Sequence, residues 1–414
     1  MALGKYAVDF EQRVDYDRLR RERLQRAKDQ MNKDGLGAIV TWDEANVRYL
    51  TGYYITTPNR PLEAQFAFCA RNGQPHLIGG NNQEELIKRM PWMEGRIHAP
   101  AAIPKIAAFG PDDPVVEKLV DQIGRLMAEY GVEKEPLGID GTTMSYVYAE
   151  AFKKKGIQVV HAKPTMDHAR MIKTQDEIEL MRITCAHSEK VFAAIVDAIR
   201  PGVRECDLVA IGMKILYEEG VDHTEDLVVC SGFNTNPYGW SFTDKPIQVG
   251  DLVYVDVDGA SYQGYKSCVY RTFCCGKATQ EQKDLYAECH KMLFDALSTI
   301  KDGSTDWQLL DKWPDSPEYW GYKAWNEVGP YCIGHGLGLT LHDRPFFNRM
   351  NQVAGAPEQT FREGMVLAVE CYAGRKGGKD GVRLEEDILV TKDGYERLTL
   401  FPIDELIECW IPYR

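Results

Sequence analysis

Two aspartates stand two positions apart in an apolar, β-branched stretch, at Asp256 and Asp258 of LVYVDVDGASYQGYKSCVYRTF (252–273). Because side chains alternate along a strand, both carboxylates should point to one face of a sheet. Burying two like charges side by side is costly unless a cation or a proton compensates. A turn near Gly259–Gly264 then returns the chain as a second strand through Cys268. The pair therefore predicts a site for a cation or a proton on a β-hairpin.

Later segments supply oxygen and nitrogen ligands that match this pair. His335 lies between glycines in CIGHGLGL, where the backbone can turn sharply, and HDRP adds His342 with Asp343 beside it. The apolar strand MVLAVE ends at Glu370, and the strand VRLEEDILVT carries Glu385. Two aspartates, one histidine and two glutamates in one cavity would suit Mn, Fe, Co or Zn, as one ion or two.

Each of these residues also has an ordinary structural interpretation. A glutamate in a strand can pair with a nearby arginine, such as Arg383 or Arg271, and a histidine between glycines can be a turn residue. Their number and their order along the chain favour a joint site over separate structural roles.

The elements around these residues suggest a domain built from two similar halves. Thr174 with Glu177 predicts a capped helix that continues to about Arg200, and Thr279 with Gln282 predicts another. The segments IRPGVRECDLV and IKDGSTDWQLL follow the two helices and resemble each other weakly. This repetition indicates a pseudo-twofold α/β domain.

The first part of the chain has its own α/β pattern up to about residue 165. Short apolar strands are expected at 37–42 and 64–70, and the Asn72–Gly73 pair predicts a hairpin turn. Amphipathic or capped patterns predict helices over 17–32, 114–130 and 142–155.

Composition narrows the class of protein. The 414 residues are 44% hydrophobic and 27% charged, which is typical of a globular protein large enough for two domains. The net charge of −13 argues against a nucleic-acid partner and against a cationic membrane-binding face. No secretory signal and no membrane span is expected, and the 11 scattered cysteines are typical of reduced thiols in the cytoplasm.

From about Met171 to Pro402 the sequence resembles the pita-bread superfamily of prolidase, aminopeptidase P, methionine aminopeptidase and creatinase. The resemblance rests on long segments in the family's order: RMIKTQDEIELMR, CSGFNTNP, IQVGDLVYVDVDGASYQGY, YRTF, GHGLGLTLHDRP, REGMVLAVE and VRLEEDILVT. GLGAIVTWDEANVRYLTGY resembles the accessory domain of the creatinase and prolidase branch. The resemblance implies an α/β (α+β) homodimer subunit with a smaller N-terminal domain over 1–166 and a pita-bread catalytic domain over 167–414.

The resemblance also implies a metal site with two departures. In metal-dependent members the ligand positions correspond here to Asp256, Asp258, His335, Glu370 and Glu385. The family's third aspartate falls at Cys268, whose thiolate could bind Zn or Fe; otherwise the site would hold one ion, or none as in metal-free creatinase. The second departure is Gly239, which stands where peptidase members carry a histidine that stabilises a substrate oxygen.

One branch of the superfamily cleaves dimethylsulfoniopropionate by β-elimination at an iron site. The segments NPYGW and VECYAGRKGGKDGVRLEEDILVTKDGYERLT (369–399) resemble that branch. However, the branch keeps an aspartate at the position of Cys268, and its proposed catalytic aspartate corresponds to Leu341 here.

These departures favour a hydrolase or lyase acting on a small polar non-peptide, such as an osmolyte or a guanidino, amide or sulfonium compound. A metal-dependent Xaa-Pro dipeptidase or aminopeptidase is the first alternative, and an inactive binding module is the second. Tyr53 and Tyr54, with Tyr238 and Trp240, are candidates for an aromatic cage around a cation, or for core positions. The candidate catalytic residues are His342, Glu370, Tyr270 and Asp343, and the candidate substrate-binding residues are Tyr238, Trp240, Arg271 and His342.

Overall fold

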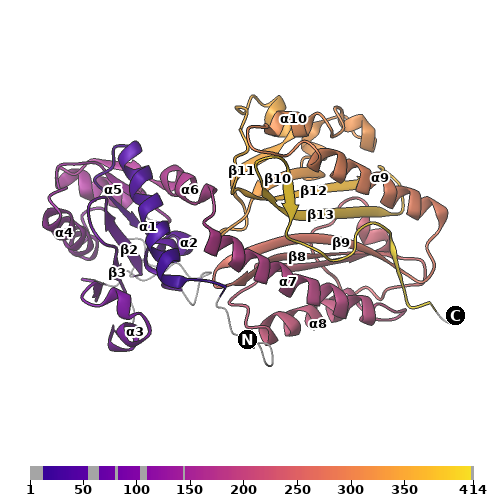
Figure 1. Cartoon of the computed structure of the whole chain (residues 1–414), viewed down its shortest axis with the longest axis horizontal. Helices are drawn as coiled ribbons and strands as arrows, with labels where there is room; N and C mark the ends of the chain where they lie inside the picture. The colour runs from indigo at the N-terminus through magenta and orange to yellow at the C-terminus, as the bar shows by residue number, and fades with distance from the viewer. Residues whose placement is uncertain (1–12, 55–64, 80–82, 103–109, 143–144, 412–414) are drawn as a thin grey trace. The chain divides into compact units, whose positions relative to one another are not determined.

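The computed structural model describes residues 13–54, 65–79, 83–102, 110–142 and 145–411 (Figure 1). Contacts divide the chain into two compact units, one spanning Asp15–Arg170 and the other beginning at Met171. No helix within the described ranges is long and apolar enough to cross a membrane.

The N-terminal unit is built on a mixed sheet in the order β4-β3-β2-β1-β5-β6. β1 pairs antiparallel with β2 and parallel with β5, and the β2–β3 hairpin turns at the predicted Asn72–Gly73 pair. Its strands are β1 (Ala38–Thr41), β2 (Phe66–Ala70), β3 (His76–Ile78), β4 (Ile97–His98), β5 (Leu137–Asp140) and β6 (Val159–His161).

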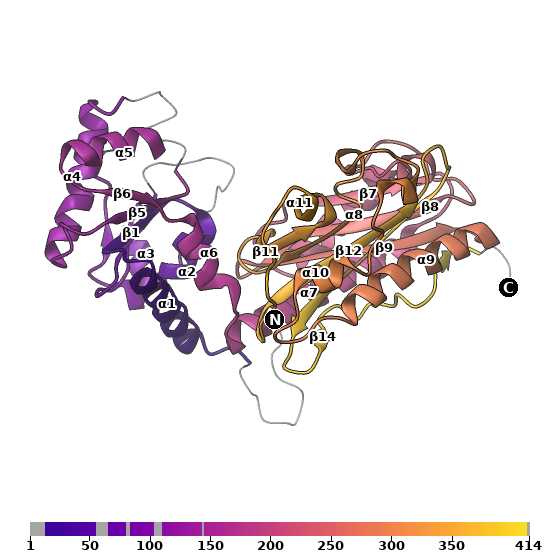
Figure 2. The same ribbon diagram turned by 90° about the horizontal axis from the view of Figure 1, so that it is seen from above.

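Helices cover both faces of this sheet, as Figure 2 shows for α4 and α5 across the sheet from α1. Alternate strand residues, such as Val40 and Phe68, pack against α4 and α5, where Ile123 and Phe152 complete a fully buried core. The helical elements are α1 (Tyr16–Lys33), α2 (Glu44–Thr51), α3 (Gln83–Arg89), η1 (Pro91–Met93), α4 (Pro114–Glu129), α5 (Ser145–Lys154) and α6 (Lys163–Met171).

These elements confirm the α/β pattern expected for the first part of the chain. Predicted helices and strands agree with the observed ones to within a few residues. The described residues do not include Ala64, at the start of the predicted strand 64–70, or residues 143–144, near the start of the predicted helix 142–155. They also do not include residues 1–12.

The C-terminal unit contains two sheets, ordered β15-β9-β8-β7 and β11-β10-β12-β13-β14. The strands are β7 (Asp226–Ser231), β8 (Leu252–Tyr262), β9 (Tyr265–Cys275), β10 (Cys332–Gly336), β11 (Asp343–Asn348), β12 (Val366–Gly374), β13 (Gly381–Val390), β14 (Tyr395–Arg397) and β15 (Ile407–Cys409). β9 and β13 pack against each other, which brings the two sheets together along one seam.

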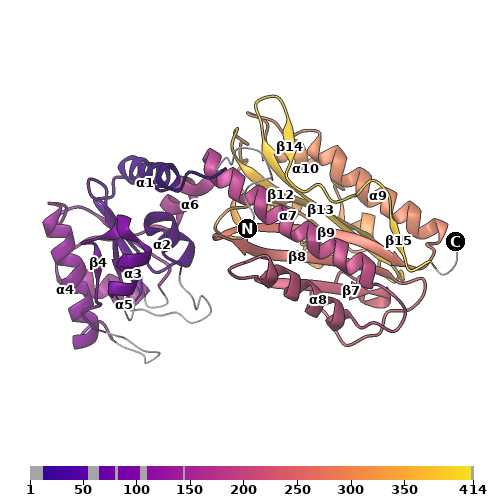
Figure 3. The same cartoon turned by 60° about the horizontal axis from the view of Figure 1, so that its bottom comes forward.

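Each sheet carries helices on its outer face. α7 contacts β8 and β9, α8 contacts β7, and α9 contacts β12 and β13 (Figure 3). The helical elements are α7 (Gln175–Ala198), α8 (Glu205–Glu218), η2 (Gly232–Thr235), α9 (Gln280–Leu297), α10 (Asp306–Leu310), η3 (Pro317–Trp320), η4 (Trp325–Glu327) and α11 (Arg349–Val353).

The two predicted capping boxes are present at the starts of α7 and α9. The Thr174 hydroxyl accepts the Glu177 N–H while the Glu177 carboxylate accepts the Thr174 N–H, and Thr279 with Gln282 repeats the arrangement. The fold class is therefore confirmed as mixed α/β. The repeat is unequal, however, because α8 has 14 residues and its counterpart α10 only 5.

Candidate metal centre and active site

The paired aspartates lie on β8, in the middle of the first sheet. Asp256 lies opposite Tyr270 and Asp258 lies opposite Cys268 on β9. A bulge follows Asp258 at Gly259, whose φ of +72° favours glycine. Asp256 and Asp258 are only 1% and 3% exposed, so alternation along the strand buries both carboxylates on one face, as the sequence predicts.

The second sheet supplies the remaining predicted ligands. Glu370 on β12 lies opposite Glu385 on β13, and β10, on the other side of β12, carries His335. All three side chains are buried. His335 Nε2 lies 3.9 Å from Glu385 Oε1, which leaves its Nδ1 facing the Gly336 carbonyl oxygen at 3.1 Å.

Ligand atoms from the two sheets gather into two groups that share Cys268. One group contains Cys268, His335 and Glu385, and the other contains Asp256, Asp258 and Cys268. Within each group the candidate ligand atoms all lie within 4.8 Å of one another. The six candidate ligands named from the sequence include all five residues of these groups, and Glu370 lies directly across from Glu385.

Several buried polar atoms in these groups lack hydrogen-bond partners among the described residues. They are Asp256 Oδ1, His335 Nε2 and both carboxylate oxygens of Glu385. An unsatisfied buried polar atom costs about 1–3 kcal/mol, and more when it is charged. Unpaired nitrogen and carboxylate oxygen atoms facing one another are what a divalent cation requires, so these residues fit a metal site.

Burial shifts the pKa of each group in the cluster in the direction that favours the uncharged form. Desolvation, with Asp258 and Glu370 nearby, raises the pKa of Asp256 well above its usual value. Desolvation also raises the pKa of Asp258 to about 7 and lowers the pKa of His335 to about 3. The pKa of Glu385 rises well above its usual value through desolvation and the Glu370 charge. Positive charge in the cluster would reverse these shifts for the carboxylates.

Arg383 forms an ion pair with one of the candidate ligands, Glu370. Its Nε donates to Glu370 Oε2 at 2.9 Å and its Nη2 donates to the same oxygen. The guanidinium carbon lies 4.5 Å from the centre of the Tyr238 ring. The sequence predicts Arg383 only as a structural partner of a glutamate, and the structure places that pair inside the candidate site.

Asp387 is a second neighbour that the sequence analysis did not select. Its Oδ2 accepts the Cys268 N–H at 3.2 Å and lies 3.5 Å from Cys185 Sγ. The residue is fully buried, and desolvation raises its pKa well above the usual value. The alternation of Arg383, Glu385 and Asp387 along one strand is the signal that could have identified both neighbours.

The two predicted residues of the HDRP segment have different surroundings. The His342 ring lies 4.4 Å from the His335 ring, centre to centre, and the residue is exposed. Partial desolvation lowers the pKa of His342, while the charge of Glu225 opposes the shift. Asp343 instead forms a buried ion pair with Lys173 at 3.9 Å, a contact that gives it a structural partner.

Arg271 lies in the seam between β9 and β13 and contacts only protein groups in the described chain. Its guanidinium donates to Glu386 Oε1 at 2.7 Å and to the carbonyl oxygen atoms of Tyr270 and Glu385. It is 1% exposed, because these contacts enclose it. These contacts give Arg271 a structural role in the seam, and its expected role in substrate binding stays a prediction.

Comparisons with known proteins agree with this arrangement. The model of metallopeptidase family M24 matches residues 179–392, which is half of the chain, and the creatinase/prolidase N-terminal domain matches residues 23–172. An Xaa-Pro dipeptidase of Pyrococcus furiosus is 31% identical over 69% of this chain and 79% of its own length. The chain belongs to metallopeptidase family M24. The predicted superfamily and the prediction of an enzyme are thereby confirmed.

Other relatives of this M24 protein include both peptidases and a lyase. A dimethylsulfoniopropionate lyase of Roseovarius nubinhibens is 25% identical over 98% of this chain and 91% of its own length. The solved prolidase of Pyrococcus furiosus has a TM-score of 0.67 at 26% identity, covering 90% of this chain and 99% of its own. Two Xaa-Pro dipeptidases of Pyrococcus are 31% and 32% identical to the chain, and so they favour the peptidase alternative over the non-peptide substrate that the sequence departures favour.

Three packed tyrosines of the M24 domain, Tyr238, Tyr254 and Tyr270, form a tyrosine wall beside Gly239, where the resemblance to peptidases leads us to expect a histidine. The Tyr254 hydroxyl accepts the Gly239 N–H at 2.8 Å and donates to the Gly239 carbonyl oxygen at 2.5 Å. A Cβ at Gly239 would lie 2.8 Å from the Asn234 carbonyl oxygen, so the backbone here admits no side chain without moving. Next to it, the hydroxyls of Tyr238 and Tyr270 lie 2.8 Å apart.

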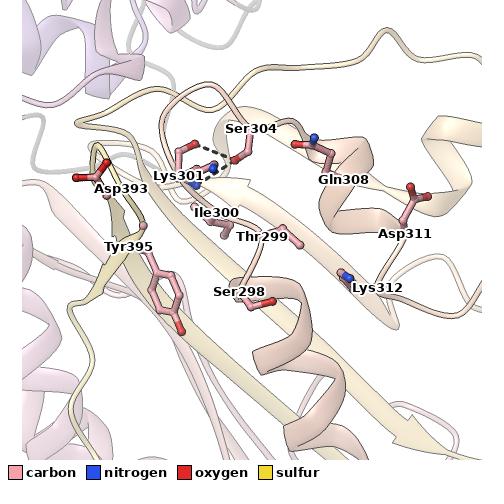
Figure 4. A pocket seen from close by; sticks show the side chains of 11 residues that line it. Ser298, Thr299, Ile300, Lys301, Ser304, Gln308, Asp311, Lys312, Asp393 and Tyr395 are labelled. Carbon is pink, nitrogen blue, oxygen red and sulfur yellow. Dashed lines mark hydrogen bonds between the residues drawn. The ribbon is translucent and has the colours of Figure 1, made fainter.

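The remaining aromatic candidates lie elsewhere. Trp240 is 61% exposed, and Tyr53 and Tyr54 are half-buried in the N-terminal unit. A polar pocket of about 740 Å³ also lies between the C-terminal end of α9, α10 and the β13–β14 turn (Figure 4). Its lining includes Ser304 and Lys301, which hydrogen-bond to each other, and none of the candidate ligands.

Proposed function

We propose that this protein is a metal-dependent hydrolase of small Xaa-Pro dipeptides. The observation that carries the proposal is the set of buried, unpaired ligand atoms contributed by Asp256, His335 and Glu385. Such buried, unpaired atoms would lower the stability of a protein in which they bound no ligand. The names of its M24 relatives support an Xaa-Pro substrate.

The candidate ligands are carboxylates and one imidazole, with one thiol among them. Asp256, Asp258, His335, Glu370 and Glu385 would hold the ion or ions, with Fe, Zn, Mn and Co as candidates and Cys268 as a further ligand. A divalent cation held there supplies Lewis acidity, which polarises a carbonyl and lowers the pKa of water.

Other side chains would position the substrate and move its proton. Both hydrogen bonds from Arg383 reach the same oxygen of Glu370, which fixes the orientation of that carboxylate. His342 stands beside His335 at an exposed position, where it can meet a substrate and donate a proton to the leaving amine. The hydroxyls of Tyr270, next to Asp256, and Tyr238 share one hydrogen bond, so the pair can offer a substrate at most one hydroxyl proton.

The test uses the chelator-treated protein, reloaded separately with Mn²⁺, Co²⁺, Zn²⁺ or Fe²⁺. Hydrolysis of Ala-Pro and Gly-Pro is expected with at least one ion, and Ala-Ala serves as the comparison substrate. Because Glu385→Gln removes a ligand oxygen and its charge, it should reduce turnover by at least about 100-fold. Glu396→Gln is the matched control, since Glu396 pairs with Arg182 on the surface. No dipeptide turnover with any of the four ions would reject the proposal.

A second candidate is a small charged non-peptide substrate. It is favoured by the closed backbone at Gly239 and by the lyase relative that aligns with 98% of the chain. The same metal-loaded samples are therefore assayed with dimethylsulfoniopropionate for release of dimethyl sulfide. Release of dimethyl sulfide without dipeptide hydrolysis would replace the first proposal with the second.

The expected homodimer and cytoplasmic location stay predictions. Light scattering of the purified protein measures the first and cell fractionation measures the second. The relatives are named enzymes, and so they favour catalysis over an inactive binding module.

A further inference from the structure

The thiol of Cys268 lies where both groups of candidate ligands meet. Its Sγ lies within 4.8 Å of the ligand atoms of His335 and Glu385 in one group, and of Asp256 and Asp258 in the other. The separation from Asp258 Oδ1 is 3.6 Å. A single sulfur atom is thus placed to contact an ion in either group.

The surroundings of Cys268 differ from those of Cys230 and Cys289. Cys230 Sγ donates to the Ser241 carbonyl oxygen at 3.1 Å, and Cys289 Sγ donates to the Cys371 carbonyl oxygen at 3.2 Å. Cys268 Sγ instead faces a carboxylate, while its backbone N–H is taken by Asp387. The sulfur therefore belongs to the polar cluster and not to the apolar core.

Independent atoms around the sulfur also point to a ligand. His335 Nε2 and both oxygens of Glu385 are fully buried and lack hydrogen-bond partners among the residues described. One of those oxygens lies 3.9 Å from the imidazole nitrogen. Sulfur, nitrogen and oxygen donors in one small volume form the donor set of Zn²⁺, Co²⁺ and Fe²⁺, whereas Mn²⁺ and Mg²⁺ prefer oxygen donors alone.

We propose that Cys268 is a direct thiolate ligand of the metal and that it gives the site a preference for Zn²⁺, Co²⁺ or Fe²⁺ over Mn²⁺. On binding, the S–H bond is broken, its proton passes to solvent, and the sulfur lone pair forms the bond to the ion. No electron is transferred. The inference rests on the metal site of the proposed function, but it does not depend on the identity of the substrate.

The experiment reads the metal–sulfur bond directly. Chelator-treated protein is titrated with Co²⁺ alone, and its absorption spectrum is recorded. A thiolate ligand gives an intense sulfur-to-cobalt charge-transfer band in the near ultraviolet, which carboxylate and imidazole ligands do not give. We expect this band in the native sequence and its loss in Cys268→Ser, with visible cobalt bands retained.

Cys185→Ser is the matched control. Cys185 is also buried and also lies beside Asp387, but it belongs to neither ligand group. This variant should keep the charge-transfer band. Native protein that binds Co²⁺ without the band, or a Cys268→Ser protein that keeps the band, would overturn the proposal.

A second measurement tests the metal preference. Native protein and Cys268→Asp are equilibrated with equal Zn²⁺ and Mn²⁺, and the retained metals are counted by mass spectrometry. The native protein should retain Zn²⁺, and the added carboxylate should raise the share of Mn²⁺ by about 10-fold or more. An unchanged share of Mn²⁺ in Cys268→Asp would contradict the preference.

The outcomes separate this inference from the proposed hydrolysis. A cobalt–thiolate band without turnover of any dipeptide would support the ligand and reject the hydrolase. Dipeptide turnover by a protein whose cobalt form lacks the band would reject the ligand and support the hydrolase.

Discussion

Gly239 and Tyr254 form the tightest contact in the tyrosine wall. The tyrosine hydroxyl holds both the N–H and the carbonyl oxygen of the glycine, and the Asn234 carbonyl oxygen blocks the space above its Cα. One hydroxyl thus fixes the backbone of the segment that follows η2, on which Tyr238 also lies. The segment's position depends on a residue that has no side chain.

We therefore expect Gly239→Ala to destabilise the protein. The added methyl group would stand 2.8 Å from a carbonyl oxygen, which should cost about 1–3 kcal/mol of unfolding free energy. Denaturant unfolding measures the change. Gly110→Ala is the control, because a Cβ there meets no atom within 4 Å. A Gly239→Ala protein as stable as its parent would contradict the packing described.

At the level of elements, α4 contains a glycine that costs stability. Gly124 lies in the interior of the helix, and a Cβ there would make only an ordinary contact of 3.9 Å with Ile157. Gly124→Ala should therefore raise the unfolding free energy by about 0.5–1 kcal/mol, because alanine loses less backbone entropy in a helix. A thermal melt checks this, and a lower melting temperature would contradict it.

β3 and β4 hold a histidine pair, buried His76 and half-buried His98, that should make the N-terminal unit sensitive to acid. His76 Nδ1 lies 2.9 Å from His98 Nε2, and His76 Nε2 lies 2.6 Å from the Tyr130 hydroxyl. Desolvation, followed by the charges of His98 and Arg96, lowers the pKa of His76 to about 4. The pKa of His76 is lower in the folded protein than in the unfolded chain. At a pH between these two pKa values, the unfolded chain therefore binds more protons than the folded protein.

The contribution of His76 to the unfolding free energy should therefore be fully present above about pH 6.5. It should be lost as the pH drops toward about 4, which lowers the unfolding free energy by up to about 3 kcal/mol. Hydrogen exchange of the β2–β3 amides across this range measures the loss. His76→Gln should flatten the profile, whereas His161→Gln, at an exposed position, should leave it unchanged. If protection fell equally steeply with pH in the native protein and in His76→Gln, His76 would not be the source of the acid sensitivity.

The sequence predicts the elements better than it predicts the contacts between them. Asp256, Asp258 and the capping residues of α7 and α9 are recognisable because their chemistry depends on neighbours a few positions away. The sequence allows Arg271 to pair with a strand glutamate, but it does not identify the partner, because Glu386 comes from a distant strand. The same holds for Asp387, which meets Cys268 only after the two sheets have packed.

At the level of the whole molecule, the candidate ligands all belong to the C-terminal unit, on strands of both its sheets. A bound ion would therefore stabilise that unit through mass action. At an ion concentration 100-fold above the dissociation constant, the unfolding free energy of the unit increases by about 2.7 kcal/mol.

We expect calorimetry to show an unfolding transition that moves up with metal and down with chelator. Glu385→Gln should abolish the shift, because it removes a ligand, and Glu396→Gln should preserve it. Hydrogen exchange should assign the stabilised amides to β8, β9, β12 and β13. Equal metal-induced protection in the N-terminal sheet would contradict this assignment.

The seam between β9 and β13 also has a consequence for the folding kinetics. Cys268 on β9 and Glu385 on β13 lie far apart in sequence, so their approach requires the closure of a long loop. The complete ligand set, which includes His335 and Glu385, can exist only after that closure. Metal should therefore leave the refolding rate nearly unchanged and slow the unfolding rate, making the ion a determinant of the protein's lifetime.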